Sequence, residues 1–372
     1  MNKLFILLLS IVIFTSCSKN KDIEAEPAEQ KRPLVDFKLV PGDDPFTFTF
    51  ENNSKEYKSL EWRFGDDSVS REVTPTHVFA TAGTFEINLK AIAEDGSTAT
   101  RVHILKILPE DGLSFVAESQ GSNKVKFSVK TTNVVVKSLL WDFGDGSAGS
   151  EDPTPTKEYA PTKLFTSKVR VTTEKGSVFT VSRIVASGGT VKDITSNHLL
   201  NVGPNFVPAR RFGGRWGIIA DWTVNDAVKQ REGGMGSWDS FDNNSMSMES
   251  WGQEPDIVNG KIEQTTLLPL EAGEYYFAQE FVGYQIKNEF YTVAAKGKSL
   301  PDITNIENNA NVLGFTKTFG SAGDGPNDPQ KKFTTYFKVP AKSDITIGFV
   351  ATLNHNDQYC RMRTLRLYQL DK

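Results

Sequence analysis

The sequence reads WRFGDDS at residues 62–68 and WDFGDGS at residues 141–147, and these two stretches decide how the N-terminal half folds. In each stretch one residue separates Trp from Phe, so both side chains point to the same face of a strand and can be buried together. The Gly-Asp pair that follows supplies the positive φ and the side-chain-to-backbone hydrogen bonds of a tight turn. Each copy therefore predicts a strand that enters a turn, with its aromatic side chains in a core.

The similarity continues beyond these stretches and makes an internal repeat. TPT at residues 74–76 recurs at residues 154–156, and Phe85 and Phe165 each begin a segment that alternates between apolar and polar side chains. A repeat of about 75 to 80 residues with this alternation is typical of a small antiparallel β-sandwich. We therefore predict two tandem β-sandwich domains, at 35–108 and 109–187.

Both segments resemble the PKD domain, an immunoglobulin-like β-sandwich with the hallmark Trp-x-Phe-Gly-Asp-Gly. The second copy carries the hallmark complete, whereas the first has Arg63 and Asp67 where the family usually has Asp and Gly. The resemblance implies spacer or interaction modules of extracellular proteins and carbohydrate-active systems. We expect Asp66 and Asp145 to cap backbone N–H groups in their turns. Calcium at such a turn has no support in the sequence, and we predict no metal or cofactor.

The N-terminus predicts secretion and lipid anchoring. Lys3 precedes an apolar run over 4–13, and Thr15-Ser16 stands directly before Cys17. The run is about ten residues long, whereas a membrane span needs about twenty, so we interpret residues 1–16 as a cleaved signal. The segment before Cys17 resembles a bacterial lipobox, which implies lipidation of Cys17. Residues 17–34 then form a polar, flexible tether.

This anchor predicts an outer-membrane lipoprotein that faces the cell exterior, although a periplasmic orientation is equally compatible with the motif. The second and last cysteine, Cys360, lies far from Cys17, and lipidation would leave it without a disulfide partner. The formal net charge of −4 does not indicate nucleic-acid binding, which usually demands a strongly basic face.

Residues 188–372 form the third predicted domain, because the repeat stops at the SGG of 187–189. No long segment has the apolar period of a major helix. Gly, Asn and Asp cluster between the strands, which favours a two-sheet antiparallel jelly roll and an all-β protein overall. The expected strands are 245–251, 261–268, 274–282, 290–295, 333–339, 345–352 and 362–370.

The segment 260–277 looks like the strand-turn-strand core of galactose-binding-like domains. It is similar to a domain of Bacteroidetes surface lipoproteins in glycan-uptake systems, where that domain often follows immunoglobulin-like or PKD modules. The resemblance implies a surface glycan-binding protein that works beside an outer-membrane importer of the starch-utilisation type. The family motif fixes no binding residues.

Aromatic residues are the main candidates for a binding site. Four of the six tryptophans, at 216, 222, 238 and 251, lie in the third domain. A sugar needs an exposed ring against its C–H face and polar groups for its hydroxyls. Trp222 and Trp251 lie among alternating strand residues and are expected in the core, whereas the position of Trp216 stays open.

Trp238 and Phe241 lie in the glycine-rich polar stretch 233–244, which predicts a loop rather than a strand. They are the candidate sugar-binding rings, although a loop aromatic can instead fold back over the end of a sandwich. A second polar loop, 354–359, contributes Tyr359 and Asp357 if it converges on the same end. The candidate polar partners of Trp238 are Arg231, Asp239, Asp242 and Asn244.

The sequence contains no Gly-x-x-x-x-Gly-Lys phosphate loop, Gly-x-Ser-x-Gly elbow or His-Glu-x-x-His pair. We therefore predict a non-catalytic surface protein that captures a polysaccharide or oligosaccharide for the importer. Two alternatives stay open. One is a structural or adhesive protein that binds another protein. The other is a surface glycoside hydrolase, whose two carboxylates can come from strands distant in sequence.

Overall fold

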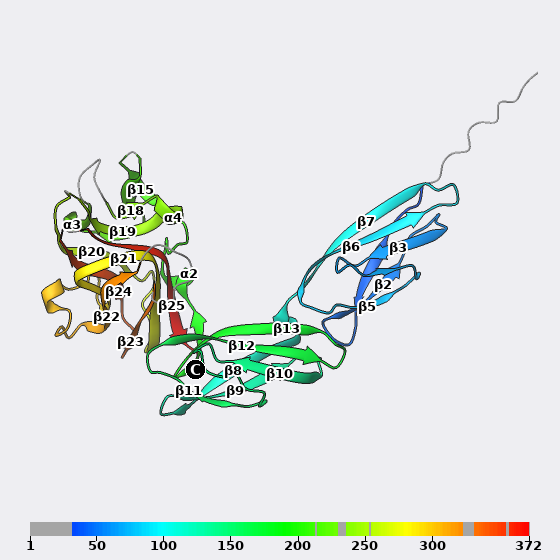
Figure 1. Ribbon diagram of the computed structural model, residues 1–372, viewed down its shortest axis with the longest axis horizontal. Helices are drawn as coiled ribbons and strands as arrows, with labels where there is room; N and C mark the ends of the chain where they lie inside the picture. The colour runs from blue at the N-terminus through cyan, green and yellow to red at the C-terminus, as the bar shows by residue number, and fades with distance from the viewer. Residues whose placement is uncertain are drawn as a thin grey trace, which may run out of the picture. The chain divides into compact units, whose positions relative to one another are not determined.

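Antiparallel β-strands make up almost the entire protein (Figure 1). The computed structural model describes residues 32–212, 214–229, 236–252, 254–322, 331–354 and 357–371, apart from the side chain of Asp242. Helices within these ranges are single turns, and none is long and apolar enough to cross a membrane. The predicted all-β class, with immunoglobulin-like sandwiches ahead of a larger β-sandwich, is confirmed.

The first repeat forms a three-stranded sheet and a four-stranded sheet. The smaller sheet has the order β1-β2-β5, and the larger has the order β4-β3-β6-β7. Their bounds are β1 (Phe37–Pro41), β2 (Thr47–Asn52), β3 (Ser59–Arg63), β4 (Val69–Ser70), β5 (Thr76–Val78), β6 (Gly83–Ile92) and β7 (Thr98–Ile107).

The second repeat follows the single helical turn α1 (Pro109–Gly112) and repeats this pattern. Strand β9 pairs with β8 and β11, and β12 pairs with β10 and β13. The bounds are β8 (Leu113–Gly121), β9 (Lys124–Thr131), β10 (Val136–Asp142), β11 (Thr156–Glu158), β12 (Leu164–Thr173) and β13 (Val178–Ala186).

The hallmark residues occupy equivalent places in the two repeats. Trp62 and Trp141 have no exposed surface, and each indole N–H donates a 3.0 Å hydrogen bond to a backbone carbonyl, of Glu72 and Asp152 respectively. In the second copy the Asp145 carboxylate accepts from the backbone N–H of Ser147 at 3.1 Å, as expected for a turn-capping aspartate. Asp66 accepts from Ser68 in the same way at 3.2 Å. The inward aromatic face and the capped turns are thus confirmed.

Strand β14 (Gly189–Asp193) links the second repeat to the C-terminal jelly roll. Its first residues pair with β13 and β8, and its last three pair with β25 (Gln358–Leu370). The jelly roll then contains two antiparallel sheets joined by the long strand β21 (Gly273–Lys296), drawn in yellow beside the red β25 in Figure 1.

The N-terminal half of β21 belongs to the first sheet, between β25 and β23 (Lys332–Val339). On its other edge β25 pairs with β19 (Ser245–Ser250), and the sheet continues through β18, β16 and β15. These three short strands are β18 (Trp238–Asp239), β16 (Trp216–Ile219) and β15 (Pro208–Arg211).

The C-terminal half of β21 belongs to the second sheet, between β22 (Val312–Ala322) and β24 (Ile345–Leu353). Strand β24 pairs with β20 (Ile257–Thr265), which pairs with β17 (Thr223–Val224). The single turns are α2 (Thr195–His198), α3 (Asp226–Lys229), α4 (Phe241–Asn244) and the 3-10 turn η1 (Ile303–Asn305).

The core of the jelly roll lies between these sheets, where Phe277, Phe337 and Phe349 have no exposed surface. Cys360 belongs to the same core and is fully buried in β25. The two strands expected at 274–282 and 290–295 are one continuous strand, because β21 changes partners along its length without a turn. Cys17 and the predicted signal segment lie outside the described residues.

Candidate functional site

One face of the first jelly-roll sheet carries the candidate site. Strand β18 lies between β16 and β19, with Asp239 opposite Trp216 on one side and opposite Ser245 on the other. Opposed residues of antiparallel strands share a face, and successive residues alternate between faces. Trp238 therefore points into the core, and Asp239 points to the opposite, outer face.

The neighbouring strands keep this alternation. Met246 and Met248 of β19 are completely buried in the core, so Glu249 lies on the outer face. The register pairs Glu249 with Tyr359 of β25, and it pairs Ser247 with Arg361. Side chains that are far apart in the sequence thus meet on one surface.

Side chains of this outer face, with three from the adjoining turns, line a pocket of about 330 Å³. This volume is at the small end of the range for ligand sites, which suits a short segment of a longer ligand. Its lining combines four aromatic rings with two guanidinium groups and one carboxyl group, and consists of Arg215, Trp216, Phe241, Glu249, Trp251, Tyr359 and Arg361.

Guanidinium groups and rings alternate along the pocket. The Cζ atom of Arg215 lies 4.2 Å from the ring centroid of Trp216 and 4.9 Å from that of Phe241. The Cζ atom of Arg361 lies 4.5 Å from the centroid of Phe241 and 4.7 Å from that of Tyr359. Each cation–π contact stabilises the arrangement by roughly 0.5–2 kcal/mol, so the rings are held in place before any ligand arrives. We call these five side chains the cation–aromatic stack.

Two rings of the pocket remain open to solvent. Trp251, just beyond the end of β19, is 44% exposed, and Phe241 is 42% exposed. Trp251 and Tyr359 pack edge to face, with 5.9 Å between their ring centroids. The turn after Trp251 is tied down by the carboxylate of Asp357, which accepts a 3.4 Å hydrogen bond from the backbone N–H of Gly252. The outermost ring is therefore both accessible and positioned.

Two acidic side chains lie beneath the cation–aromatic stack. Asp239 has no exposed surface, and its two oxygens accept from Nε and Nη2 of Arg215, each at 2.6 Å. Its Oδ1 also accepts from the backbone N–H of Phe241 at 2.9 Å, so this carboxylate positions the stack. Glu249 accepts from the hydroxyl of Ser247 at 2.9 Å. Burial and the nearby charge of Asp239 raise the pKa of Glu249.

The structure corrects the sequence-based assignment of the rings. Trp238 is fully buried, and its indole N–H donates a 2.7 Å bond to the carbonyl of Phe206, so the prediction of an exposed sugar-binding ring was wrong. Trp251, expected in the core, is exposed instead. Trp222 is buried as expected, at 6% exposure. The stretch around Trp238 is a short paired strand that packs closely on β16. A Cβ at Gly217 would lie 3.1 Å from the Trp238 ring, and a Cβ at Gly236 would lie 2.2 Å from the carbonyl oxygen of Gly217.

The remaining candidates divide between the pocket and its surroundings. Trp216, Phe241 and Tyr359 line the pocket, and Tyr359, expected in a polar loop, lies at the start of β25. Asp239 lies below the pocket, and Asp357 acts through the turn that it anchors. Asn244 accepts at its backbone carbonyl from the N–H of Phe206 at 2.9 Å and does not line the pocket. Arg231 and the Asp242 side chain lie outside the described residues.

Sequence reasoning missed Arg215 and Arg361, and it considered Glu249 only as one of several possible hydrolase acids, although a signal was present. The stretch SMSMESW at 245–251 alternates strictly, with the two methionines in phase with each other and Glu249 and Trp251 in the opposite phase. A period of two places the methionines inward and Trp251 outward. YCRM at 359–362 shows the same alternation, with Tyr359 and Arg361 outward.

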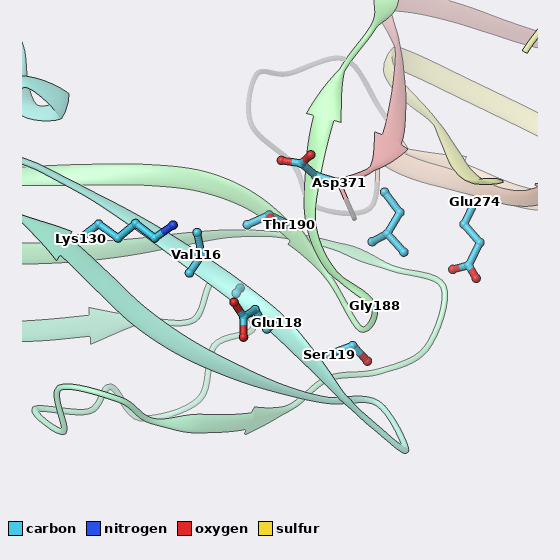
Figure 2. Close-up of a pocket in the computed structure, with 10 residues that line it drawn as sticks. Val116, Glu118, Ser119, Lys130, Gly188, Thr190, Glu274 and Asp371 are labelled. Carbon is cyan, nitrogen blue, oxygen red and sulfur yellow. The ribbon is translucent and has the colours of Figure 1, made fainter. Parts of the chain in front are cut away.

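A larger cavity lies where β14 changes partners (Figure 2). It measures about 790 Å³, and Figure 2 shows Glu118 from β8, Glu274 from β21 and Asp371 after β25 around it. None of the described residues that line it is aromatic, so it offers no ring for a sugar face. Within the described part of the chain, no group of three or more His, Cys, Asp and Glu side chains could hold a metal ion.

Comparisons with known protein families match two parts of the chain. A PKD domain family matches residues 33–107, which confirms the predicted resemblance for the first repeat. A family described as a domain of unknown function (DUF5013) matches residues 200–348, a range that includes most of the pocket residues.

Individual relatives cover the chain only in part. Collagenase ColA of Clostridium perfringens is 28% identical over 87 residues, and the match spans 23% of this chain and 8% of the collagenase. Among solved structures, the PKD1 domain of Vibrio anguillarum Epp is 25% identical, covering 21% of this chain and 96% of that domain, with a TM-score of 0.20. A structure of carbohydrate-binding modules from the β-sandwich superfamily is 11% identical, covering 91% of this chain and 99% of its own, with a TM-score of 0.23.

Proposed function

We propose that the protein binds a glycan, without cleaving it, in the pocket between Trp216 and Trp251. The observation that carries this proposal is the combination of partly exposed rings and fixed polar groups in one pocket of about 330 Å³. Sugar rings present C–H faces that pack on aromatic side chains, and their hydroxyls need hydrogen-bond partners at the edge. Trp251 and Phe241 supply the rings, and the guanidinium groups supply donors.

The rigidity of the pocket also supports a binding role. Arg215 is held both by the Asp239 carboxylate and by stacking against two rings, so little side-chain freedom remains to be lost when a ligand binds. Preorganisation of this kind increases affinity because fewer rotamers must be fixed on association. A site that holds a polysaccharide for a neighbouring protein needs this property and needs no reactive group.

The test is affinity electrophoresis and calorimetry with a panel of soluble polysaccharides. We expect at least one glycan to bind the wild type and to bind Trp251→Ala more weakly. Phe319→Ala is the matched control, because Phe319 is also an exposed ring, at 56%, but lies on β22 outside the pocket. Folded wild type that binds no glycan in the panel would contradict the proposal.

A glycoside hydrolase is the second candidate, and one observation favours it. Burial and the neighbouring Asp239 raise the pKa of Glu249, and a carboxyl group with a raised pKa beside a second carboxyl group is the pattern of a general acid and its partner. However, Asp239 has no exposed surface, and Arg215 occupies both its oxygens. Release of new reducing ends from a bound glycan, abolished in Glu249→Gln, would support hydrolysis over binding.

A protein-binding or adhesive role is the third candidate, because Trp, Tyr and Arg are also the side chains that dominate protein interfaces. A partner protein that is retained equally by wild type and by Trp251→Ala in a pull-down would place that contact outside the pocket. Loss of both the partner and the glycan in Trp251→Ala would instead indicate one shared surface.

We also propose that Cys17 is lipidated and anchors the protein to the outer membrane, with the binding domain facing outward beside an importer of the starch-utilisation type. The lipobox-like segment before Cys17 supports this arrangement. To test lipidation, an alkyne fatty acid should label the wild type but not Cys17→Ser. To test orientation, protease added to intact cells should cut the protein. Protection from protease in intact cells but not in lysed cells would indicate a periplasmic orientation.

A further inference from the structure

The pocket presents hydrogen-bond donors on its open side and keeps its acceptors beneath. Asp239 is fully buried, and both its oxygens already accept hydrogen bonds. The side chain of Glu249 is 7% exposed, and its Oε1 accepts from Ser247. In contrast, the side chain of Arg215 is 41% exposed. A guanidinium group carries five N–H donors and no acceptor, so the accessible polar surface of Arg215 is donor-only.

Neutral and acidic glycans differ in their fit to such a surface. A sugar hydroxyl group both donates and accepts hydrogen bonds. A guanidinium group can bond to its oxygen but offers no acceptor for its O–H. A carboxylate only accepts, its two oxygens match the planar guanidinium fork, and the charge-assisted bonds are roughly twice as strong as neutral ones. The pocket geometry therefore favours a sugar that carries a carboxylate.

The local charge is compatible with this ligand, although the whole chain has a formal net charge of −4. Two guanidinium groups, of Arg215 and Arg361, border the pocket, and the carboxylate of Asp239 is committed to Arg215. Glu249 lies 3.8 Å from Arg361 and 4.0 Å from Arg215, measured between its Oε1 and the guanidinium nitrogens. Burial raises the pKa of Glu249, which lowers the negative charge of the pocket near neutral pH.

We infer that the ligand of this pocket is an acidic glycan whose uronate-type carboxylate pairs with the guanidinium group of Arg215 while a sugar ring packs on Trp251. The side chain of Arg361 is 8% exposed, so its charge acts from beneath the pocket. This inference rests on the proposed glycan-binding function and specifies its substrate class. The carboxylate would meet the cation–aromatic stack from its open side, where Arg215 is accessible. Trp251 stands at the end of the same pocket and covers the face of the sugar ring.

The experiment compares pairs of polymers that differ only in charge. Polygalacturonate and alginate are each measured by calorimetry against the full-length protein, beside the same polymers with methyl-esterified carboxyl groups, and dextran sulfate is measured beside dextran. At least one uronate should bind about tenfold more tightly than its ester, with an advantage that shrinks as salt rises. Dextran sulfate should bind more tightly than dextran, because a guanidinium fork also binds tetrahedral oxyanions.

Variants separate charge from geometry. Arg215→Lys keeps a cation beside Asp239 but removes the fork, and it should lower the affinity for the uronate about tenfold more than it lowers the affinity for the ester. Urea unfolding checks that the variant remains folded. Lys317→Gln is the control, because this cation also lies over aromatic rings, those of Tyr291 and Phe319, but does not line the pocket.

Each outcome has a distinct meaning. Equal affinity for the acid and its ester, or tight binding of neutral polysaccharides alone, would overturn the acidic-ligand inference and leave the glycan-binding function standing. Absence of binding to every polymer, acidic or neutral, would overturn both. Preference for the acid that survives undiminished in Arg215→Lys would refute the assignment of the carboxylate to this guanidinium group.

Discussion

Truncation of Trp251 to alanine gives the sharpest test of the candidate site. A tryptophan side chain presents roughly 250 Å² when it is fully exposed. Since Trp251 is 44% exposed, about 110 Å² remain for a ligand to cover. At about 25 cal/mol per Å², full coverage stabilises the complex by about 2.7 kcal/mol, and coverage of half that area by about 1.4 kcal/mol. Each 1.4 kcal/mol is a tenfold change in Kd, so Trp251→Ala should weaken binding by about 10- to 100-fold.

The same substitution should leave the fold intact. Trp251 lies just beyond β19 on the surface, and its contact inside the pocket is the edge-on packing against Tyr359. We therefore expect the free energy of unfolding to change by less than about 1 kcal/mol, as measured by urea denaturation. Calorimetry with the bound glycan provides the Kd, and Phe319→Ala should match the wild type. A Kd within about twofold of wild type in folded Trp251→Ala would refute the role of this ring.

Three further predictions concern stability and pH. Asp239→Asn removes the charge that pairs with Arg215 and should lower the free energy of unfolding by about 2–3 kcal/mol, measured in urea. Trp141→Ala empties a fully buried site and should cost about 3–5 kcal/mol, whereas Trp141→Phe, which mainly loses the indole N–H bond, should cost less. Burial raises the pKa of Glu249 from 4.5 to about 7, so its contribution to stability is complete below pH 4.5 and is lost as pH rises through 7. The stability of the wild type relative to Glu249→Gln should therefore fall by up to ~3 kcal/mol over that interval, and a difference that stays flat across it would contradict the assignment.

The tandem sandwiches could be predicted from local sequence because their determinants are local. Trp and Phe one residue apart, followed by Gly-Asp, define both the inward face and the turn. The structure places Trp62 and Trp141 in their cores with matching N–H bonds, as the repeat predicted. Each of these two domains could therefore be predicted from its own residues alone.

The site was harder to predict because its strands are short and its side chains come from separate segments. A glycine-rich stretch around Trp238 predicted a loop, yet pairing with β16 and β19 makes it a strand. Two residues cannot show a period, so no local pattern indicates that Trp238 faces the core and Asp239 the opposite face of the sheet. The alternation around the two methionines of β19, in contrast, does indicate that Trp251 points outward.

The residue pattern alone determined the all-β class, the repeat and its buried aromatic faces, because alternation and turn chemistry act over a few neighbouring residues. Only the tertiary structure decided which rings reach solvent and which charges meet. Arg215, Asp239, Glu249 and Arg361 come together through the register of β18, β19 and β25, and strand register is set by pairing between distant segments. A shift of one residue in any one of these strands would have moved its side chains to the other face.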